Sequence, residues 1–544
     1  MNRQNFWVYN GEAEAPGKDY WKFLNATIDD LKKEDITLNN IFEVVNKITN
    51  PELKQKMINK IHDLIIENGI FEISNIYVLV LFDKEEIKRI IEKEVNDNLD
   101  TYTSNETNLK YYSINIDHLM SAFEKYGQDY NWKLSMNRKV LDRIKNYSNK
   151  LLIRYIEASK NHNDIYNALI DEYYDYLPIE YKNYIKIQRD PFYMMNKAKQ
   201  FESIDIGIDS NISIGPEIEA NIDYAFSLDL QNQIGFDNYS VSNDSTVSNG
   251  DEVNTIKPFH NVPSDVAQFC ALCETMKDVG YYYSEVDGDA AGQINLGLDY
   301  LDTKESILNF YEIYGNCEEL IYYISSEEGQ LFRQNVYTNS RIKALSEIIG
   351  RRVLDEELTR LDVIKLFNKT TLEDDAIDGL LYKKNSVCLR GSYDGDFRLE
   401  FRIPNGGCNY KTWIDNIRLY GKMLEAAKKL ADMMKKDYLT SEEEKMIKLK
   451  INMQDASLSL EEKLHMLMDL LFEDNSIKQI YYDRYNATIR RINETQATNY
   501  ENHNHHEPNF DTVLFEEQYH SRLDPDYIDK NSIEYDPNEG IIKH

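Results

Sequence analysis

Charged and apolar residues alternate in two short segments whose residue types could bind a metal and a phosphate. In IGPEIEANI, Glu217 and Glu219 lie two residues apart, and DFRLEFRIP places Arg398, Glu400 and Arg402 at the same spacing. Residues i and i+2 of a β-strand point to one face, so each segment is expected to gather its charges on one side. Carboxylates are good Mg²⁺ ligands, and guanidinium forks neutralise phosphate oxygens. The pattern therefore indicates metal-bound nucleotide chemistry.

Two further segments repeat this design. AAGQINLGL presents Gln293 and Asn295 together, and NGDEVNTI presents Glu252 and Asn254 together. Taken singly, each segment is also compatible with an ordinary strand whose polar side faces water. Taken together, they predict one sheet face that holds a divalent cation through Glu217, Glu219, Glu252 and Glu400.

The elements that must position these residues indicate an α+β fold. Residues 1–204 carry helical patterns and are expected to form a helical N-terminal domain. Near residue 205, short β-branched segments begin to alternate with Gly, Asn and Asp, which predicts a mixed domain over 205–435. Ser459 and Glu462 form a capping box within a helical extension over 436–500, and an acidic tail follows over 501–544.

The order of the motifs resembles the amidoligase family. IGPEIE is followed by NDSTVSNGDEVNT, AAGQINLGLDYL and RLEFRIPNGG with a helix after it, and the likeness covers roughly residues 205–435. The family belongs to the carboxylate–amine ligase superfamily, which includes glutamine synthetase and glutamate–cysteine ligase. The resemblance implies a curved antiparallel sheet that cradles ATP and Mg²⁺. A carboxylate would be phosphorylated to an acyl phosphate and then attacked by an amine.

Carried over by position, the resemblance assigns roles to the sheet residues. It implies metal-binding acids at Glu217, Glu219, Glu252 and Glu400. It implies catalytic roles for Arg402, Arg398, Gln293 and Asn295, of which Arg398, Arg402 and Asn295 would also contact the nucleotide.

Gln293 departs from the family, which usually has a histidine at this point. All ten histidines lie outside the motif strands. A glutamine offers an amide donor and a carbonyl oxygen but lacks the basicity and metal affinity of imidazole. An alternative is therefore a weakened or inactive ligase fold that acts as a nucleotide- or peptide-binding protein or scaffold.

A basic segment supplies candidate substrate contacts. RIKALSEIIGRR is rich in cations within a very acidic chain, and similar segments occur in relatives that the chain resembles. Such cations could attract a phosphate or a substrate carboxylate. The alternative is a solvated helix that pairs with acidic neighbours. The candidates are Arg341, Lys343 and Arg352.

Charge, hydropathy and cysteine content argue against several classes of protein. The formal net charge is −32, which argues against a nucleic-acid coat. No apolar stretch approaches the roughly 20 residues of a membrane span, and five cysteines are too few for a disulfide framework, which favours a reducing cytoplasm. The expected partners are ATP, Mg²⁺, a peptide or protein carboxylate and an amine donor. A glutamate–cysteine-ligase-like enzyme acting on free amino acids is a further alternative.

Overall fold

The computed structural model describes about two thirds of the chain in discontinuous stretches. The longer ones are 51–68, 81–93, 129–146, 149–160, 163–222, 238–243, 250–283, 290–327, 341–355, 357–369, 385–391 and 397–502, and the short ones are 24–25, 27, 30, 45–46, 48–50, 95–96, 247, 371–372 and 377–378. The expected acidic tail lies outside these residues except for its first two positions.

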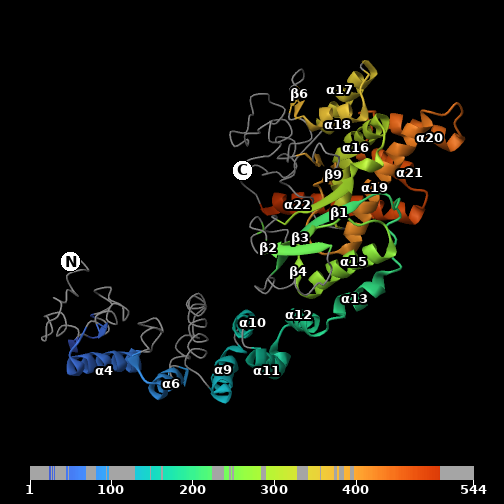
Figure 1. Cartoon of the computed structure of the whole chain (residues 1–544). Coiled ribbons are helices and arrows are strands. Elements are labelled where there is room, and N and C mark those ends of the chain that lie inside the picture. The colour runs from blue at the N-terminus through green and yellow to red at the C-terminus, as the bar shows by residue number, and fades with distance from the viewer. Residues whose placement is uncertain are drawn as a thin grey trace. The chain divides into compact units, whose positions relative to one another are not determined.

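The chain divides into two compact units, Met1–Lys182 and Asn183–His544. The described elements of the first unit are helical (Figure 1). They include α4 (Pro51–Asn68), α6 (Lys84–Lys93), α9 (Tyr130–Ile144), α10 (Asn149–Ala158) and α11 (Asn163–Tyr173). Polar contacts join neighbouring helices: His62 bonds Glu86 at 2.7 Å, and the Trp132 indole donates to Glu92 at 2.7 Å. Helix α12 (Ile179–Arg189) spans the division between the units.

The second unit contains a seven-stranded sheet in the order β2-β3-β1-β5-β9-β8, with β4 also paired to β1. Its strands are β1 (Ile214–Ile222), β2 (Tyr239–Asn243), β3 (Gly250–Thr255), β4 (Tyr281–Tyr282), β5 (Gly292–Gly297), β8 (Val387–Arg390) and β9 (Arg398–Phe401). All the pairs are antiparallel. The predicted α+β class is therefore confirmed.

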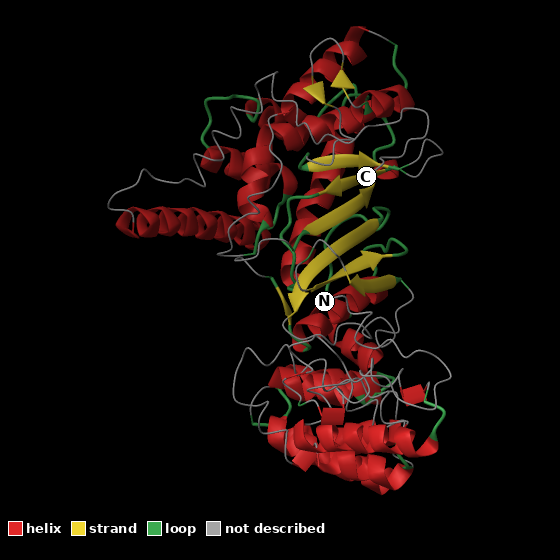
Figure 2. Cartoon of the chain, turned by 90° about the vertical axis from the view of Figure 1, so that its left-hand side faces the viewer, coloured by secondary structure: helices red, strands yellow, loops and turns green. Residues whose placement is uncertain are grey.

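One face of this sheet forms the core with three helices, α15 (Pro263–Asp278), α16 (Lys304–Ser325) and α19 (Tyr410–Met433). Figure 2 shows helices lying behind the twisted sheet. Phe401 of β9 stacks on Tyr420 of α19 with ring centroids 4.1 Å apart, and Phe259 stacks on Phe269 of α15 at 5.5 Å. Alternation along the strands thus places apolar side chains against the helices and polar ones on the opposite face.

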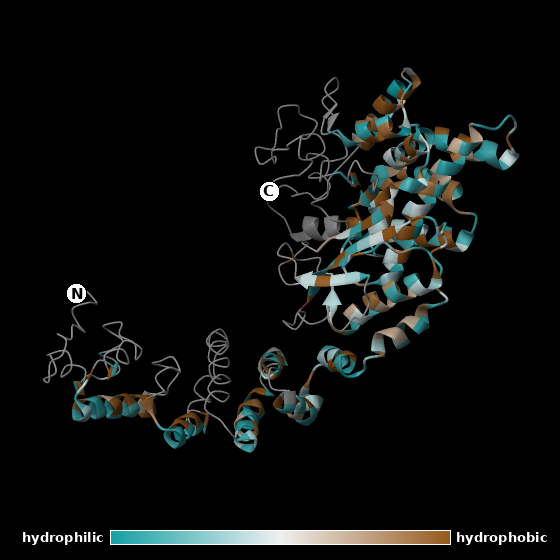
Figure 3. Cartoon of the chain, in the orientation of Figure 1, coloured by the Kyte–Doolittle hydropathy of each residue, from teal (hydrophilic) through white to brown (hydrophobic). Residues whose placement is uncertain are grey.

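Side-chain caps mark the starts of the two longest of these helices. Thr303 forms a capping box with Ser306 at the start of α16, and Asn409 caps α19 by accepting from Lys411. These caps satisfy backbone N–H groups that have no partner within the helix. Figure 3 shows hydrophobic and hydrophilic residues alternating along the helices, so that each has an apolar side.

The C-terminal helices complete the second unit. They are α20 (Ser441–Asn452), α21 (Leu460–Leu471) and α22 (Asn475–Asn502), while α17 (Arg341–Asp355), α18 (Arg360–Asn368) and a small hairpin of β6 (Thr371–Leu372) and β7 (Ile377–Asp378) precede β8. The predicted capping box of Ser459 and Glu462 is confirmed at the start of α21. Among the described residues, none of the helices combines the length and apolarity required to cross a bilayer.

Candidate functional site

The four motif segments form adjacent strands in the order β3, β1, β5 and β9. The register pairs Glu219 with Glu252, Glu217 with Gln293, and Asn295 with Glu400. Residues that are directly opposite on paired strands point to the same side of a sheet. The predicted polar residues of the four segments therefore share one face, opposite the face that packs on the helices.

Carboxylates occupy the β3 and β1 side of this polar face. The Glu217 carboxylate accepts a hydrogen bond from Asn295 Nδ2 at 2.8 Å. Burial raises the pKa of Glu217, and the nearby carboxylates of Glu400 and Glu252 raise it further against the opposing effects of Asn295 and Arg398. Negative charge is thus crowded around Glu217, and a cation there would relieve the repulsion.

Glu219 is engaged in hydrogen bonds that hold the sheet together, a role that its position in the sequence does not indicate. Its side chain is 8% exposed, and its Oε2 accepts the Ala291 backbone N–H at 2.6 Å. Its backbone oxygen accepts the N–H of Gly407 at 2.9 Å. The carboxylate therefore helps to join β1 to the segment that leads into β5.

Arginines occupy the β9 and β8 side. Glu400, 5% exposed, pairs with Arg390 at 3.2 Å and also with Arg402. Burial acts to raise the pKa of Glu400, but the charges of Arg390 and Arg402 outweigh it and lower the pKa overall. Glu400 is therefore an ionised anchor for two arginines.

Arg390 was not among the residues predicted from the sequence. It lies at the end of β8, directly opposite Arg398 of β9 in the register. The signal that could have found it is the alternation in VCLR, which places Cys388 and Arg390 on the face of Glu400. Like charges opposite each other on paired strands destabilise a sheet, so this pair favours an anion nearby.

The two amides of β5 lie between the carboxylates and the arginines. Asn295 Nδ2 donates to Gly215 O at 2.9 Å as well as to Glu217, and its Oδ1 accepts from Arg398 Nε at 2.9 Å. Gln293 Oε1 accepts from Arg402 Nη1 at 3.1 Å. The amides therefore connect the acidic and basic parts of the face.

The four predicted metal ligands are not arranged as a ready-made cage. Within the described stretches, no three Asp, Glu, His or Cys side chains form a group that could hold a metal ion. Magnesium in nucleotide sites usually keeps several waters and takes only one or two carboxylates together with substrate phosphates. Glu217 and Glu252 fit that smaller set of ligands, because their mutual repulsion favours a bound cation.

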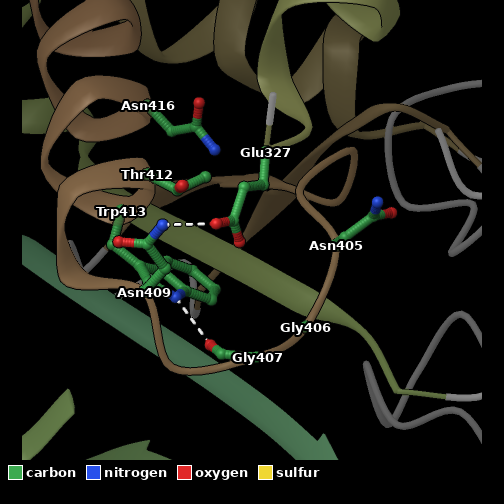
Figure 4. Close-up of a pocket in the computed structure, with 8 residues that line it drawn as sticks. All are labelled: Glu327, Asn405, Gly406, Gly407, Asn409, Thr412, Trp413 and Asn416. Carbon is green, nitrogen blue, oxygen red and sulfur yellow. Dashed lines mark hydrogen bonds between the residues drawn. The ribbon is translucent and has the colours of Figure 1, made fainter. Parts of the chain in front are cut away.

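A polar pocket borders the sheet where β1 meets the loop after β9 (Figure 4). Asn409 donates to Glu327 at 2.5 Å, and the Trp413 indole donates to Gly407 O at 2.9 Å. Gly407 has φ +100°, which side chains disfavour, and a Cβ on Gly406 would lie 2.2 Å from Glu219 O. The RIPNGG motif therefore needs its glycines to bring this loop against β1.

The basic segment lies in α17, which packs against α16 rather than forming part of the sheet. A Cβ on Gly315 of α16 would lie 2.7 Å from the backbone of Lys343. The Lys343 ammonium reaches Gln454 O at 3.5 Å, toward the C-terminal helices. The structure places Arg352 in the same helix, whereas the side chain of Arg341 is outside the described residues.

Comparison of the chain with protein-family models and with curated proteins finds no match. Inference about function therefore depends on the polar face itself.

Proposed function

We propose that the polar face binds ATP with Mg²⁺ and that the protein is a carboxylate–amine ligase with a sheet of the glutamine synthetase and glutamate–cysteine ligase type. The observation that supports this most is the separation of charge across adjacent strands. Glu217 and Glu252 lie on one side, and Arg390, Arg398 and Arg402 lie on the other. A metal-bound polyphosphate has the complementary pattern, with a cation at one part and phosphate oxygens at another.

In this proposal the acidic residues would bind the cation and the arginines would bind the phosphates. Glu217 and Glu252 would hold Mg²⁺, which withdraws charge from phosphate oxygens when bound, and Glu219 and Glu400 would be further acids of the face. Arg398 and Arg402 would bind the oxygens on which negative charge grows during transfer, and removing one such donor typically costs about 3 kcal/mol of barrier. In this proposal Glu400 also orients Arg402.

The proposed reaction requires no enzyme nucleophile. A substrate carboxylate oxygen attacks the γ-phosphorus of ATP, which releases ADP and gives an acyl phosphate. An amine then attacks the acyl carbon, inorganic phosphate leaves, and an amide remains. Net loss of one water from the two joined substrates is the signature. A peptide or protein substrate is favoured because large helical regions flank the sheet.

A second candidate is a non-catalytic protein that binds nucleotide or peptide on the same face. It is favoured by Gln293, whose carbonyl oxygen is engaged with Arg402 where the family resemblance leads one to expect an imidazole. A glutamine cannot act as a general base. Binding of ATP with Mg²⁺ that leads to no turnover would support this candidate.

The test incubates the full chain with ATP, Mg²⁺ and a pool of native cell peptides, and measures ADP, phosphate and peptide masses. We expect ADP formation and products lighter by one water, and Glu217→Gln should abolish both. Asp432→Asn, an acid-to-amide change in an exposed ion pair of α19, is the matched control and should leave turnover unchanged. Turnover with free glutamate and amines would indicate a small-molecule ligase instead. Wild-type protein that does not bind ATP with Mg²⁺ would exclude the ligase and the nucleotide-binding form of the second candidate.

A further inference from the structure

Each of the two β5 amides binds one arginine of the neighbouring chain segment: Arg398 lies in β9, and Arg402 directly follows β9. Asn295 Oδ1 accepts from Arg398 Nε at 2.9 Å, and Gln293 Oε1 accepts from Arg402 Nη1 at 3.1 Å. The register accounts for the first contact: Asn295 is opposite Glu400, so its side chain lies next to that of Arg398 on the same face. The second contact joins Gln293 to the arginine that directly follows β9.

The orientation of Asn295 follows from its partners. Its nitrogen donates to the Gly215 carbonyl at 2.9 Å, and a carbonyl can only accept. Its oxygen must therefore face Arg398, whose guanidinium can only donate. Because Asn295 is 7% exposed and makes three hydrogen bonds, it holds the Arg398 side chain from a fixed base.

Gln293 suits Arg402 for a related reason. Arg402 Nη1 donates both to Gln293 and to Glu400, so a neutral acceptor and a charged acceptor hold the same end of the guanidinium. A protonated imidazole at position 293 would repel this arginine, whereas the amide oxygen attracts it at any pH. The glutamine is therefore matched to its arginine.

The spacing of the arginines indicates the size of the anion. Arg398 and Arg402 are four residues apart, which is about 14 Å of extended chain at about 3.4 Å per residue. Arg390 and Arg402 both contact Glu400, which lies between the two ends of this row. Three arginines in one row can each bind a different phosphoryl group of a chain, and this favours a polyphosphate over a single phosphate.

We propose that Gln293 and Asn295 are positioning residues that aim Arg402 and Arg398 at an extended polyphosphate, and that they select it over a single phosphate. This inference builds on the proposed function, because it concerns how the same face recognises the phosphates of its nucleotide. It requires no catalytic step.

The test measures binding to the full chain by titration calorimetry with three probes: ATP with Mg²⁺, inorganic tripolyphosphate and inorganic phosphate. Gln293→Leu should weaken the binding of the two polyphosphates on the order of tenfold, the effect typical of losing a hydrogen bond to a charged group. In an Arg402→Ala background, the same change should alter affinity by less than about twofold, because Gln293 then has no arginine to orient. A purely structural role would weaken binding in both backgrounds.

Gln268→Leu is the matched control, since Gln268 is a half-buried residue of α15, which packs on the opposite face of the sheet. It should leave tripolyphosphate affinity unchanged. Unfolding by urea verifies that each variant is folded, and Gln293→Met, which has a similar shape, replaces Gln293→Leu if the latter unfolds.

The outcomes separate this inference from the proposed function. Equal polyphosphate affinity of wild type and Gln293→Leu, tighter binding by Gln293→His, or equal affinity for phosphate and tripolyphosphate would overturn the positioning role while the ligase proposal stands. Tight polyphosphate binding that depends on Gln293, without amide formation, would overturn the ligase proposal alone. Wild-type protein that binds none of the probes would overturn both.

Discussion

Replacing Glu400 by glutamine should destabilise the second unit strongly. The Glu400 side chain is 6% exposed, and its arginine partners Arg390 and Arg402 are 15% and 16% exposed. At the 3.2 Å separation from Arg390, a pair of unit charges attracts by about 5 kcal/mol at an effective dielectric constant of 20. Desolvation opposes much of this attraction, and removing one partner from a buried pair typically costs about 3 kcal/mol. We therefore expect Glu400→Gln to lower the free energy of unfolding by about 3 kcal/mol.

The assay is urea unfolding followed by the fluorescence of Trp413, which is buried in α19 beside the sheet. The other tryptophans are replaced by phenylalanine in both proteins so that the signal reports this unit. Asp432→Asn is the control, because its partner Lys435 and Asp432 itself are 59% and 51% exposed, and exposed pairs contribute less than about 1 kcal/mol.

The pH dependence provides a second measurement. The arginines lower the pKa of Glu400, so its stabilisation is present above the unfolded carboxyl pKa and is lost as the pH falls through the folded value. The difference between wild type and Glu400→Gln should therefore shrink toward pH 3. A loss at pH 7 no greater than that of Asp432→Asn would refute the assignment of Glu400 as the anchor of the arginines.

Three further perturbations should give defined results. Glu217→Gln should raise the thermal midpoint at pH 7 without Mg²⁺, because burial and neighbouring acids raise the pKa of Glu217 and the folded wild type therefore loses stability as the pH rises through that pKa. Near pH 4 the carboxyl is protonated and the two proteins should have the same midpoint, whereas a lower midpoint of the variant at pH 7 would contradict this. Gly407→Ala should cost about 1–2 kcal/mol in urea unfolding because its φ is +100°, whereas Gly350→Ala, in helix α17 with room for a Cβ, should be neutral or stabilising. Arg484→Met should cost about 3 kcal/mol and increase proteolysis of α22, because it removes a buried arginine and leaves the half-buried Asp415 without this partner; unchanged proteolysis would show that α22 is held by other contacts.

The polar face could be predicted from the sequence because strand alternation is a local property. Parity alone predicted that Glu400 and Arg402 share one side of their strand, and the strand order then puts Glu217 on the same face of the sheet. The adjacency itself is a long-range property that no single segment contains. The family resemblance led us to expect that these segments form one sheet, and the register of the strands shows which of their residues are neighbours.

The roles within the face could not be predicted in the same way. Glu219 has the same parity as Glu217, yet its carboxylate accepts the backbone N–H of Ala291, 72 residues away. Arg390 was missed because a four-residue strand with one charged side chain has little pattern. Both roles depend on which residues become neighbours in the folded sheet, and these neighbours lie in other segments of the sequence.

The polar face shows why two carboxyls of similar sequence context behave oppositely. Glu217 and Glu400 are both shielded from water, and burial alone would raise both pKa values. Two arginines lower the pKa of Glu400, whereas the acids near Glu217 raise its pKa against the opposing effects of Asn295 and Arg398. The amides of β5 thus separate a side that already has its counter-ions from a side that still requires one. A ligand that brings its own cation to Glu217 and its anionic groups to the arginines would satisfy both sides at once, and neither a free anion nor a free cation can do so.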